Sequence, residues 1–257
     1  MNETFSFGVL SLCLALSTQL LASESGSDEK STPVNRLDFT YAAFDSDSLD
    51  KLTGFFGYTR SLSSKSNLNL RFAYLESRFG PSGGMGFGDT TVTWSYLPNF
   101  ELSVGPWVPR IVGSGVSVML PTGNENQGRG LGSSIITPFV GTVVPVTDTF
   151  SIAPTLLYAY SIDPIFTGND VRVGLLDLGL SVVRNSGWWV NFYLGYIYDF
   201  EAANNSFGNR LSVGKRLSNG LGLSAHYIDY ESFMPGVAPT TAQQYNRVYE
   251  LTVSYSF

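Results

Sequence analysis

The chain has 257 residues and a formal net charge of −6, and only 14% of its residues are charged. A soluble domain usually carries about 25% charged residues, so much of this surface is not expected to face water. A mildly acidic chain without a basic cluster is a poor candidate for binding nucleic acid, and no such partner is expected. After the first 22 residues no apolar run is long enough for a membrane-spanning helix, which leaves a closed β-barrel as the way to satisfy backbone groups in lipid.

The start of the chain is typical of a secretory leader. Residues 5–21 are largely apolar and are followed by the small residue Ala22, which predicts a signal peptide over residues 1–22. Because no Lys or Arg precedes the apolar stretch, a membrane-anchoring helix is kept as the alternative. The single cysteine, Cys13, lies in this leader, so the mature chain is expected to have no disulfide. Residues 23–33 are then a short polar segment and residues 34–257 the barrel.

The rest of the chain alternates between apolar and polar or small residues, which is typical of strands with one apolar face. Leu156 and Val253 are predicted to face lipid, and their neighbours Thr155 and Thr252 the interior. The first two strands alternate poorly, and their facing is left open. Twelve strands are predicted, with ten or fourteen as alternatives, and their bounds are 35–44, 52–62, 67–75, 87–96, 110–120, 134–144, 150–160, 171–183, 188–200, 208–217, 221–231 and 245–257.

The connections from the fifth strand onward alternate in length. The long ones are predicted at 121–133, 161–170, 201–207 and 232–244, and the short ones at 145–149, 184–187 and 218–220. Outer-membrane barrels have long external loops and short periplasmic turns, so both termini are predicted to be periplasmic. The connection 97–109 is long for a turn and contains Pro106 and Pro109, so we interpret it as a bulged start to the fifth strand.

The end of the chain carries a second signal. Tyr249, Leu251, Val253, Tyr255 and Phe257 lie on one face of the last strand. A terminal Phe preceded by apolar residues at every second position resembles the C-terminal signature of bacterial outer-membrane proteins. The resemblance implies that the barrel-assembly machinery recognises Tyr255 and Phe257. With the leader, this end predicts an all-β, transmembrane antiparallel β-barrel in the bacterial outer membrane, surrounded by outer-membrane lipid.

Two local patterns carry a family resemblance. Residues 86–90 read Gly-Phe-Gly-Asp-Thr at the start of the fourth strand, and residues 120–123 read Leu-Pro-Thr-Gly at the exit of the fifth. Together they resemble a transporter-like outer-membrane family named for the MetA pathway of phenol degradation, which is linked by context to uptake of aromatic or other apolar compounds. The motif residues are Gly86, Gly88, Asp89, Thr90, Leu120, Pro121, Thr122 and Gly123.

The same motif residues also have a structural interpretation, which we favour over a ligand site. Gly86 and Gly88 permit a bend at the barrel rim. Pro121 ends the ladder, and Gly123 allows a positive φ in the turn that follows. Asp89 is expected to point inward at the rim.

Charged side chains within the strands are expected to avoid lipid. The residues predicted to face the interior and line a pore are Arg71, Asp177, Arg210, Arg216, His226 and Glu250. Two interpretations stay open: the charges line a selective path, or they form ion pairs that fill a narrow interior. A barrel of eight strands is filled by side chains and one of sixteen or more encloses an aqueous pore, so twelve strands predict a narrow or partly plugged lumen.

His226 is the only histidine of the chain, and it is predicted to share an inward face with Ser224. Some outer-membrane lipid hydrolases pair a His and a Ser two residues apart, but their order is the reverse, and no orienting carboxylate is evident here. A single His does not make a metal site. No catalytic residue, metal or cofactor is therefore predicted.

The sequence favours a passive outer-membrane channel for uptake of small apolar or aromatic molecules over an enzyme. The alternatives are a lipid-modifying hydrolase, for which no triad is found, and a structural or adhesive barrel, against which the short external loops count.

Overall fold

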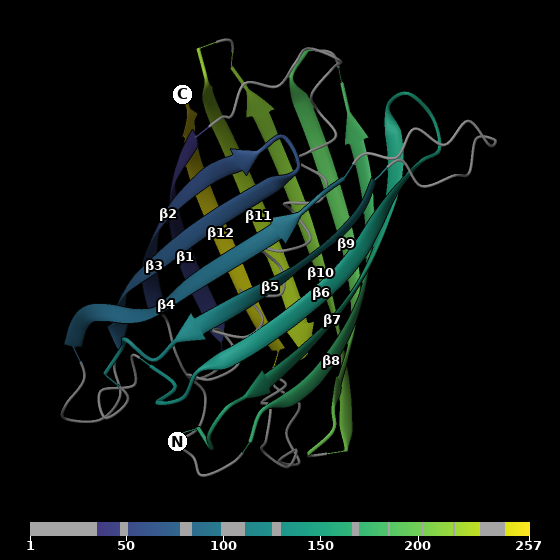
Figure 1. Ribbon diagram of the computed structural model, residues 1–257. Coiled ribbons are helices and arrows are strands. Elements are labelled where there is room, and N and C mark those ends of the chain that lie inside the picture. The colour runs from purple at the N-terminus through teal and green to yellow at the C-terminus, as the bar shows by residue number, and fades with distance from the viewer. Residues whose placement is uncertain are drawn as a thin grey trace.

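The computed structural model describes residues 35–46, 51–77, 84–98, 111–124, 130–165, 170–184, 186–201, 203–217, 219–231 and 245–257. These residues form one closed antiparallel barrel in which each strand pairs with its neighbours in the sequence (Figure 1). The strands are β1 (Asn35–Ser46), β2 (Lys51–Ser63), β3 (Ser66–Ser77), β4 (Gly84–Tyr96), β5 (Ile111–Leu120), β6 (Ile135–Pro145), β7 (Phe150–Ser161), β8 (Arg172–Val183), β9 (Trp188–Asp199), β10 (Asn204–Arg216), β11 (Leu221–Glu231) and β12 (Tyr245–Ser256). No helix among the described residues is long and apolar enough to cross a membrane.

The predicted all-β barrel of twelve strands is confirmed. The predicted signal peptide (1–22), the polar segment (23–33) and the connection 232–244 lie outside the described residues. Most of the connection 97–109 lies outside them as well, and β5 begins only at Ile111.

The first and last described residues of the barrel meet. β1 pairs with β12 from Arg36 opposite Ser256 to Ser46 opposite Asn246. At the end of this ladder the amide of Asn35 donates to the carbonyl of Phe257 at 3.0 Å, and the amide of Phe257 donates to the carbonyl of Asn35 at 2.9 Å. The even number of strands therefore returns the chain to the end where β1 begins, which is at the top of Figure 1. We call this the terminal end, and the opposite end, with the connections 121–134 and 162–171, the loop end.

Three connections at the terminal end are short, as predicted: 146–149, 184–187 and 217–220. Two of them use a glycine with a positive φ, at Gly187 (82°) and Gly220 (81°). A side chain at Gly187 would meet the carbonyl oxygen of Arg216. Such tight turns therefore need glycine both for the backbone angle and for the close approach of the next strand.

The predicted long connection 201–207 is wrong. β10 begins at Asn204, so a short turn joins it to β9, with Ala203 at a positive φ of 50°. Two features close this turn: the amide of Glu201 donates to Asp199 Oδ1 at 2.8 Å, and Phe207 lies beside Tyr196 with ring centroids 5.1 Å apart. Asparagine and serine usually indicate a loop, but the inward face of a barrel strand accepts polar residues.

The two faces of the barrel wall are chemically distinct. Outward-facing Leu156 is 55% exposed and its inward-facing neighbour Thr155 is 2% exposed. Val253 is exposed on the outer surface in the same way, so the predicted register of these strands is confirmed. The facing of β2, which the sequence left open, is settled by Phe56, which is exposed on the outside, whereas Phe55 packs inside.

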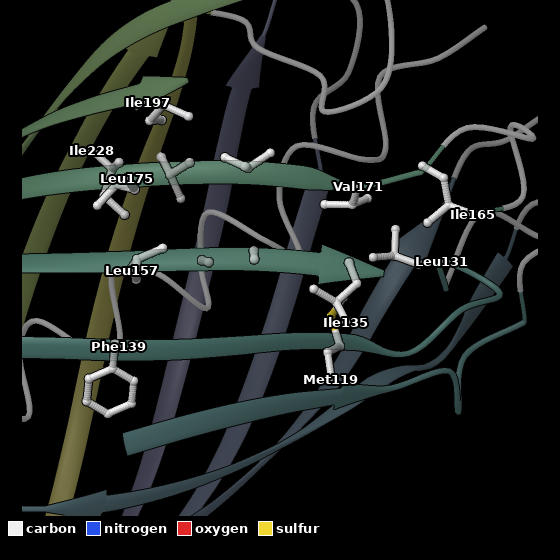
Figure 2. Close-up of a cluster of buried hydrophobic side chains, with 14 residues drawn as sticks. Met119, Leu131, Ile135, Phe139, Leu157, Ile165, Val171, Leu175, Ile197 and Ile228 are labelled. Carbon is white, nitrogen blue, oxygen red and sulfur yellow. The ribbon is translucent and has the colours of Figure 1, made fainter. Parts of the chain in front are cut away.

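The inward side chains near the loop end are largely apolar. Figure 2 shows Met119, Leu131, Ile135, Ile165 and Val171 gathered around the loop ends of the strands. Leu131 and Ile165 come from connections rather than from strands, so these two residues pack against the inner wall from outside the sheet. The full cluster, which we call the apolar cluster, is Ala42, Met119, Leu131, Ile135, Phe139, Leu157, Ala159, Ile165, Val171, Val173, Leu175, Ile197, Ile228 and Val248.

Candidate functional site

A belt of charged and polar side chains crosses the middle of the barrel interior, on the terminal side of the apolar cluster. The belt consists of Arg71 (β3), Asp177 (β8), Arg210 (β10), His226 (β11) and Glu250 (β12). Each is near the midpoint of its strand and has the parity of the inward face, as predicted. Arg216 has the same parity, but it is the last residue of β10 and is exposed at the terminal end, outside the belt.

Arg71 lies at the boundary between the belt and the apolar cluster. Its guanidinium carbon is 3.9 Å from the centroid of the Phe55 ring, a cation–π geometry. Phe55 in turn packs against the apolar cluster. Arg71 stands opposite Gly57 of β2, which stands opposite Asp38 of β1, so Asp38 and Arg71 lie at matching positions on the inward wall.

Arg210 is buried, at 4% exposure, and is held by a hydrogen-bonded network. Its Nε donates to Ser212 Oγ at 3.1 Å and its terminal nitrogen contacts His226 Nδ1 at 3.2 Å. The guanidinium carbon also lies 5.5 Å from the centroid of the Tyr193 ring. These contacts hold the Arg210 guanidinium in the wall of the interior.

His226 and Ser224 are hydrogen-bonded, but the hydrogen bond runs in the wrong direction for a serine hydrolase. Ser224 Oγ lies 2.9 Å from His226 Nε2. On the other side of the ring, Nδ1 faces the Arg210 guanidinium, which has only donors, and the hydroxyl of Ser212 at 2.8 Å. Nδ1 must therefore accept, and the neutral ring carries its proton on Nε2 and donates it to Ser224. A serine nucleophile needs the opposite arrangement, in which the ring nitrogen accepts the serine proton.

Asp177 occupies the opposite side of the belt. It is 3% exposed and lies in register with Thr155 of β7 and Gly195 of β9. Its charge acts on Tyr193, which stands between it and Arg210 in the strand order. The belt therefore carries charges of both signs, and the carboxylates and guanidiniums come from different strands.

The motif residues at the loop end form a cluster of hydrogen bonds around Asp89 and Thr122, which we call the knot. Asp89 Oδ1 accepts a hydrogen bond from the amide of Gly123 at 2.9 Å, and Oδ2 accepts one from the amide of Leu131 at 2.8 Å. Thr122 Oγ1 donates to the carbonyl of Gly88 at 3.0 Å and lies 2.8 Å from Thr90 Oγ1. The motif thus holds Gly123 and Leu131 to β4, and these contacts favour the structural interpretation. The predicted positive φ at Gly123 is wrong, because the positive-φ glycines of the described residues are Gly132, Gly187 and Gly220.

The wall is irregular at this knot. The described ladder of β4 with β5 ends at Thr90 opposite Leu120, although β4 itself continues to Gly84. Next to this point the register of β4 against β3 shifts between Phe72 and Tyr74, so two residues of β4, Gly88 and Asp89, stand opposite one residue of β3. This is a β-bulge, and bulges bend a strand and interrupt its pairing. Pro121, which follows β5, has no amide hydrogen to continue the ladder.

From the belt to the terminal end, the inward face carries hydrogen-bonded pairs on adjacent strands. Each pair joins residues that stand opposite each other in register. The pairs are Thr40–Thr252 (2.8 Å), Thr59–Asn69 (2.8 Å), Ser61–Asn67 (2.9 Å), Thr93–Ser117 (2.7 Å) and Ser181–Asn191 (2.7 Å). An ion pair between Arg36 and Asp38 at 2.9 Å lies in the same region.

Several residues of this site were not predicted from the sequence. Phe55 was missed because Phe56 follows it, so alternation alone does not say which of the two rings points inward. Tyr193 shares its inward parity with Asn191, and this parity was the available signal. Arg36 and Asp38 were missed because β1 alternates poorly in sequence.

The fold is that of known outer-membrane channels. No protein-family model matches this chain, and no curated protein matches it in sequence. Among solved structures, the COG4313 outer membrane channel from Pseudomonas putida F1 has a TM-score of 0.64 at 13% identity, covering 91% of this chain and 99% of that one. The NanC porin (TM-score 0.60, 11% identity, 85% and 98% covered) and the KdgM porin (0.59, 12%, 86% and 99%) have the same architecture.

These likenesses, all below 25% identity, establish the fold. The strands close into a barrel, and many large apolar side chains are exposed on its outer face, which is the form in which strands cross a lipid bilayer. The chain is thus a barrel of the bacterial outer membrane.

Proposed function

We propose that this protein is an outer-membrane channel for passive uptake of small apolar or aromatic molecules. The observation that carries the proposal is the apolar cluster inside the loop half of the barrel. Porin interiors are usually polar, because water fills them. An interior lined by aliphatic side chains instead favours solutes that gain free energy when their apolar surface leaves water.

The motif resemblance supports the same solute class. The family named for the MetA pathway of phenol degradation is linked to aromatic or other apolar compounds, and residues 86–90 and 120–123 carry its pattern. In this proposal both termini are periplasmic and the loop end faces the outside, so a solute meets the apolar cluster first and the belt second. Arg71, Asp177, Arg210, His226 and Glu250 then line the path, and Arg216 stands at its exit.

The interruption beside β4 offers apolar solutes a route through the wall. The β4–β5 ladder stops at Thr90, and beyond it hydrogen bonds that each involve a side chain hold Thr122 and Gly123 to β4. Met119 precedes Leu120, at which the ladder stops, and the amide of Leu131 donates to Asp89 beside the gap; both residues belong to the apolar cluster. A solute could therefore leave the loop half sideways into lipid without crossing the belt.

The channel itself is tested by planar-bilayer recordings on the refolded protein, together with uptake of a small aromatic by cells that have or lack it. We expect a small conductance and reduced uptake in the deletion strain. Silent recordings with unchanged uptake would contradict the proposal, and a phospholipid hydrolysis assay with His226→Ala would then test the enzyme alternative.

The side route is tested with the double variant Thr90→Cys/Thr122→Cys. The two hydroxyls are 2.8 Å apart, so oxidation is expected to tie the connection to β4 and close the gap. Uptake of a neutral aromatic should slow on oxidation and recover on reduction, with the ion conductance unchanged. The single variant Thr90→Cys is the control. Equal uptake in both redox states would rule out the side route and leave the axial path.

A further inference from the structure

We propose that the outer wall at the terminal ends of β8, β9 and β10 binds the phosphate of an anionic phospholipid, of the phosphatidylglycerol class. The site is an outward-facing row of Arg184, Trp188 and Lys215, which we call the cationic row. The two cations hold the phosphate, and the acyl chains lie against the apolar wall beside them. This inference shares only the periplasmic position of the terminal end with the proposed function, and its test needs no solute transport.

The pairing of three adjacent strands fixes the cationic row. Trp188 stands opposite Lys215 in the ladder of β9 with β10. On its other side, the amide of Arg184 donates to the carbonyl of Trp188 at 2.8 Å, which places Arg184 at the end of the β8–β9 ladder. Arg184 has the outward parity of Val182, and both Arg184 and Trp188 are exposed. The ammonium of Lys215 lies 5.1 Å from the centroid of the Trp188 ring, a cation–π distance that keeps this charge on the outer surface.

The wall immediately toward the loop end of the cationic row is apolar. Val182, Val190 and Val213 stand in register across the same three strands and are exposed on the outer face. On the other side of the row the chain leaves the wall, in the connections 184–187 and 217–220. The row therefore marks the level at which Trp and basic side chains of a membrane protein meet lipid head groups. A lipid whose phosphate reaches this level lays its acyl chains along the valines.

The charge of this region is positive because its strands contribute no carboxylate. Residues 178–198 and 202–228 contain no Asp or Glu, and Arg216 adds a third cation beside the row. The flanking strands bring two carboxylates to this end, Asp148 before β7 and the chain end at Phe257 after β12. In the part of the chain that the structure describes, no carboxylate forms an ion pair with either cation of the row. An anionic head group is therefore attracted to this surface.

The two cations differ in how they bind a phosphate. The guanidinium of Arg184 offers paired donors that match two phosphate oxygens, whereas the ammonium of Lys215 is a point charge. Arg60 of β2 is also exposed on the outer face at the terminal end, but its partners in register, Asn35 and Leu68, are uncharged. A single cation of this kind attracts anionic lipid less than a row of two.

The test is native mass spectrometry of the refolded full-length protein in a neutral detergent. The protein is offered equal amounts of phosphatidylglycerol and phosphatidylcholine with the same acyl chains. We expect the first bound lipid to be phosphatidylglycerol, in an excess on the order of tenfold, as two basic residues beside an anionic head group provide. Inorganic phosphate alone, in large excess, should not displace it, because the ion has no acyl chains to bury.

Arg184→Gln combined with Lys215→Gln should bring the binding of the two lipids close to equality. The matched control is Arg60→Gln combined with Lys65→Gln, which removes the same charge from exposed positions at the same end and should leave the preference intact. Heat-modifiable migration on gels establishes that each variant is folded. If the first double variant does not fold, its two single variants decide, and each should lose part of the preference.

Loss of the preference in the row variants, but not in the control, supports the lipid site. Equal binding of the two lipids by the wild type, a preference that survives in the row variants, or an equal loss in the control overturns it. Displacement of the lipid by inorganic phosphate also overturns it, because a simple anion site then explains the binding. Each of these contrary results leaves the channel proposal standing, since none of them measures transport.

Discussion

The two halves of the barrel interior are stabilised differently. Near the loop end, inward side chains such as Ile135, Leu157 and Val173 pack as an apolar cluster. Between the belt and the terminal end, a smaller apolar group of Leu97, Val143, Ala153 and Tyr193 is accompanied by hydroxyls and amides. These polar groups pair in register across adjacent strands, as Thr93 does with Ser117 at 2.7 Å. Aliphatic contacts have no fixed direction and tolerate a solute of varied shape, whereas a hydrogen bond fixes both partners. In the proposed channel the loop half holds the solute, and the terminal half holds the barrel in register.

The largest effect on stability is expected when a large side chain of the apolar cluster is shortened. Leu157→Ala removes a side chain that is 2% exposed inside the barrel, and should lower the free energy of unfolding by about 2–5 kcal/mol. Leu156→Ala, one residue away and facing lipid, is the matched control. Its cost should be smaller, because hydrocarbon chains of the bilayer replace the lost contacts. Urea titration of the protein in lipid vesicles measures both, and equal costs would mean that the loop half is not packed.

A smaller effect is expected at the knot that holds the connection 121–134 over the apolar cluster. Asp89→Ala removes the acceptor for the amides of Gly123 and Leu131, at a cost of about 1–3 kcal/mol. The connection should then be cut faster by added protease, while the barrel stays folded. Asp148→Ala, in an exposed turn at the terminal end, is the control. Unchanged cleavage in Asp89→Ala would show that the knot does not anchor the connection.

The smallest effect is expected in the terminal half. Ser117→Ala leaves Thr93 without its partner in a buried site and should cost about 1 kcal/mol. Thr93→Val combined with Ser117→Ala should cost less than the two single changes added together, because neither polar group is then left alone. A double-mutant cycle on unfolding free energies measures this coupling. Strict additivity would contradict the importance of the pair.

Sequence alternation predicts most of the fold because lipid on one side of the wall enforces a strict period of two. Leu156 and Val253 were assigned to the correct face for this reason. The turn between β9 and β10 was not predicted, because Asn204, Asn205 and Ser206 have loop-forming composition, whereas Asn204 and Ser206 in fact lie on the inward face of β10.

The candidate site was only partly predictable. Alternation assigns Arg71 and Arg210 to the inward face, but it does not say which inward residues pack in the apolar cluster and which pair by hydrogen bonds. The knot around Asp89 joins β4 to a connection more than thirty residues later. No local pattern in the sequence specifies those hydrogen bonds.

Single-channel recording with a neutral aromatic solute tests the central claim most directly. The account predicts that benzyl alcohol added at the loop end interrupts the ion current reversibly, that arabinose at the same concentration does so far less, and that Leu157→Asn weakens the interruptions by making the apolar cluster polar. Interruptions by arabinose but not by benzyl alcohol, or a current that neither solute affects, would contradict an apolar solute path through the loop half.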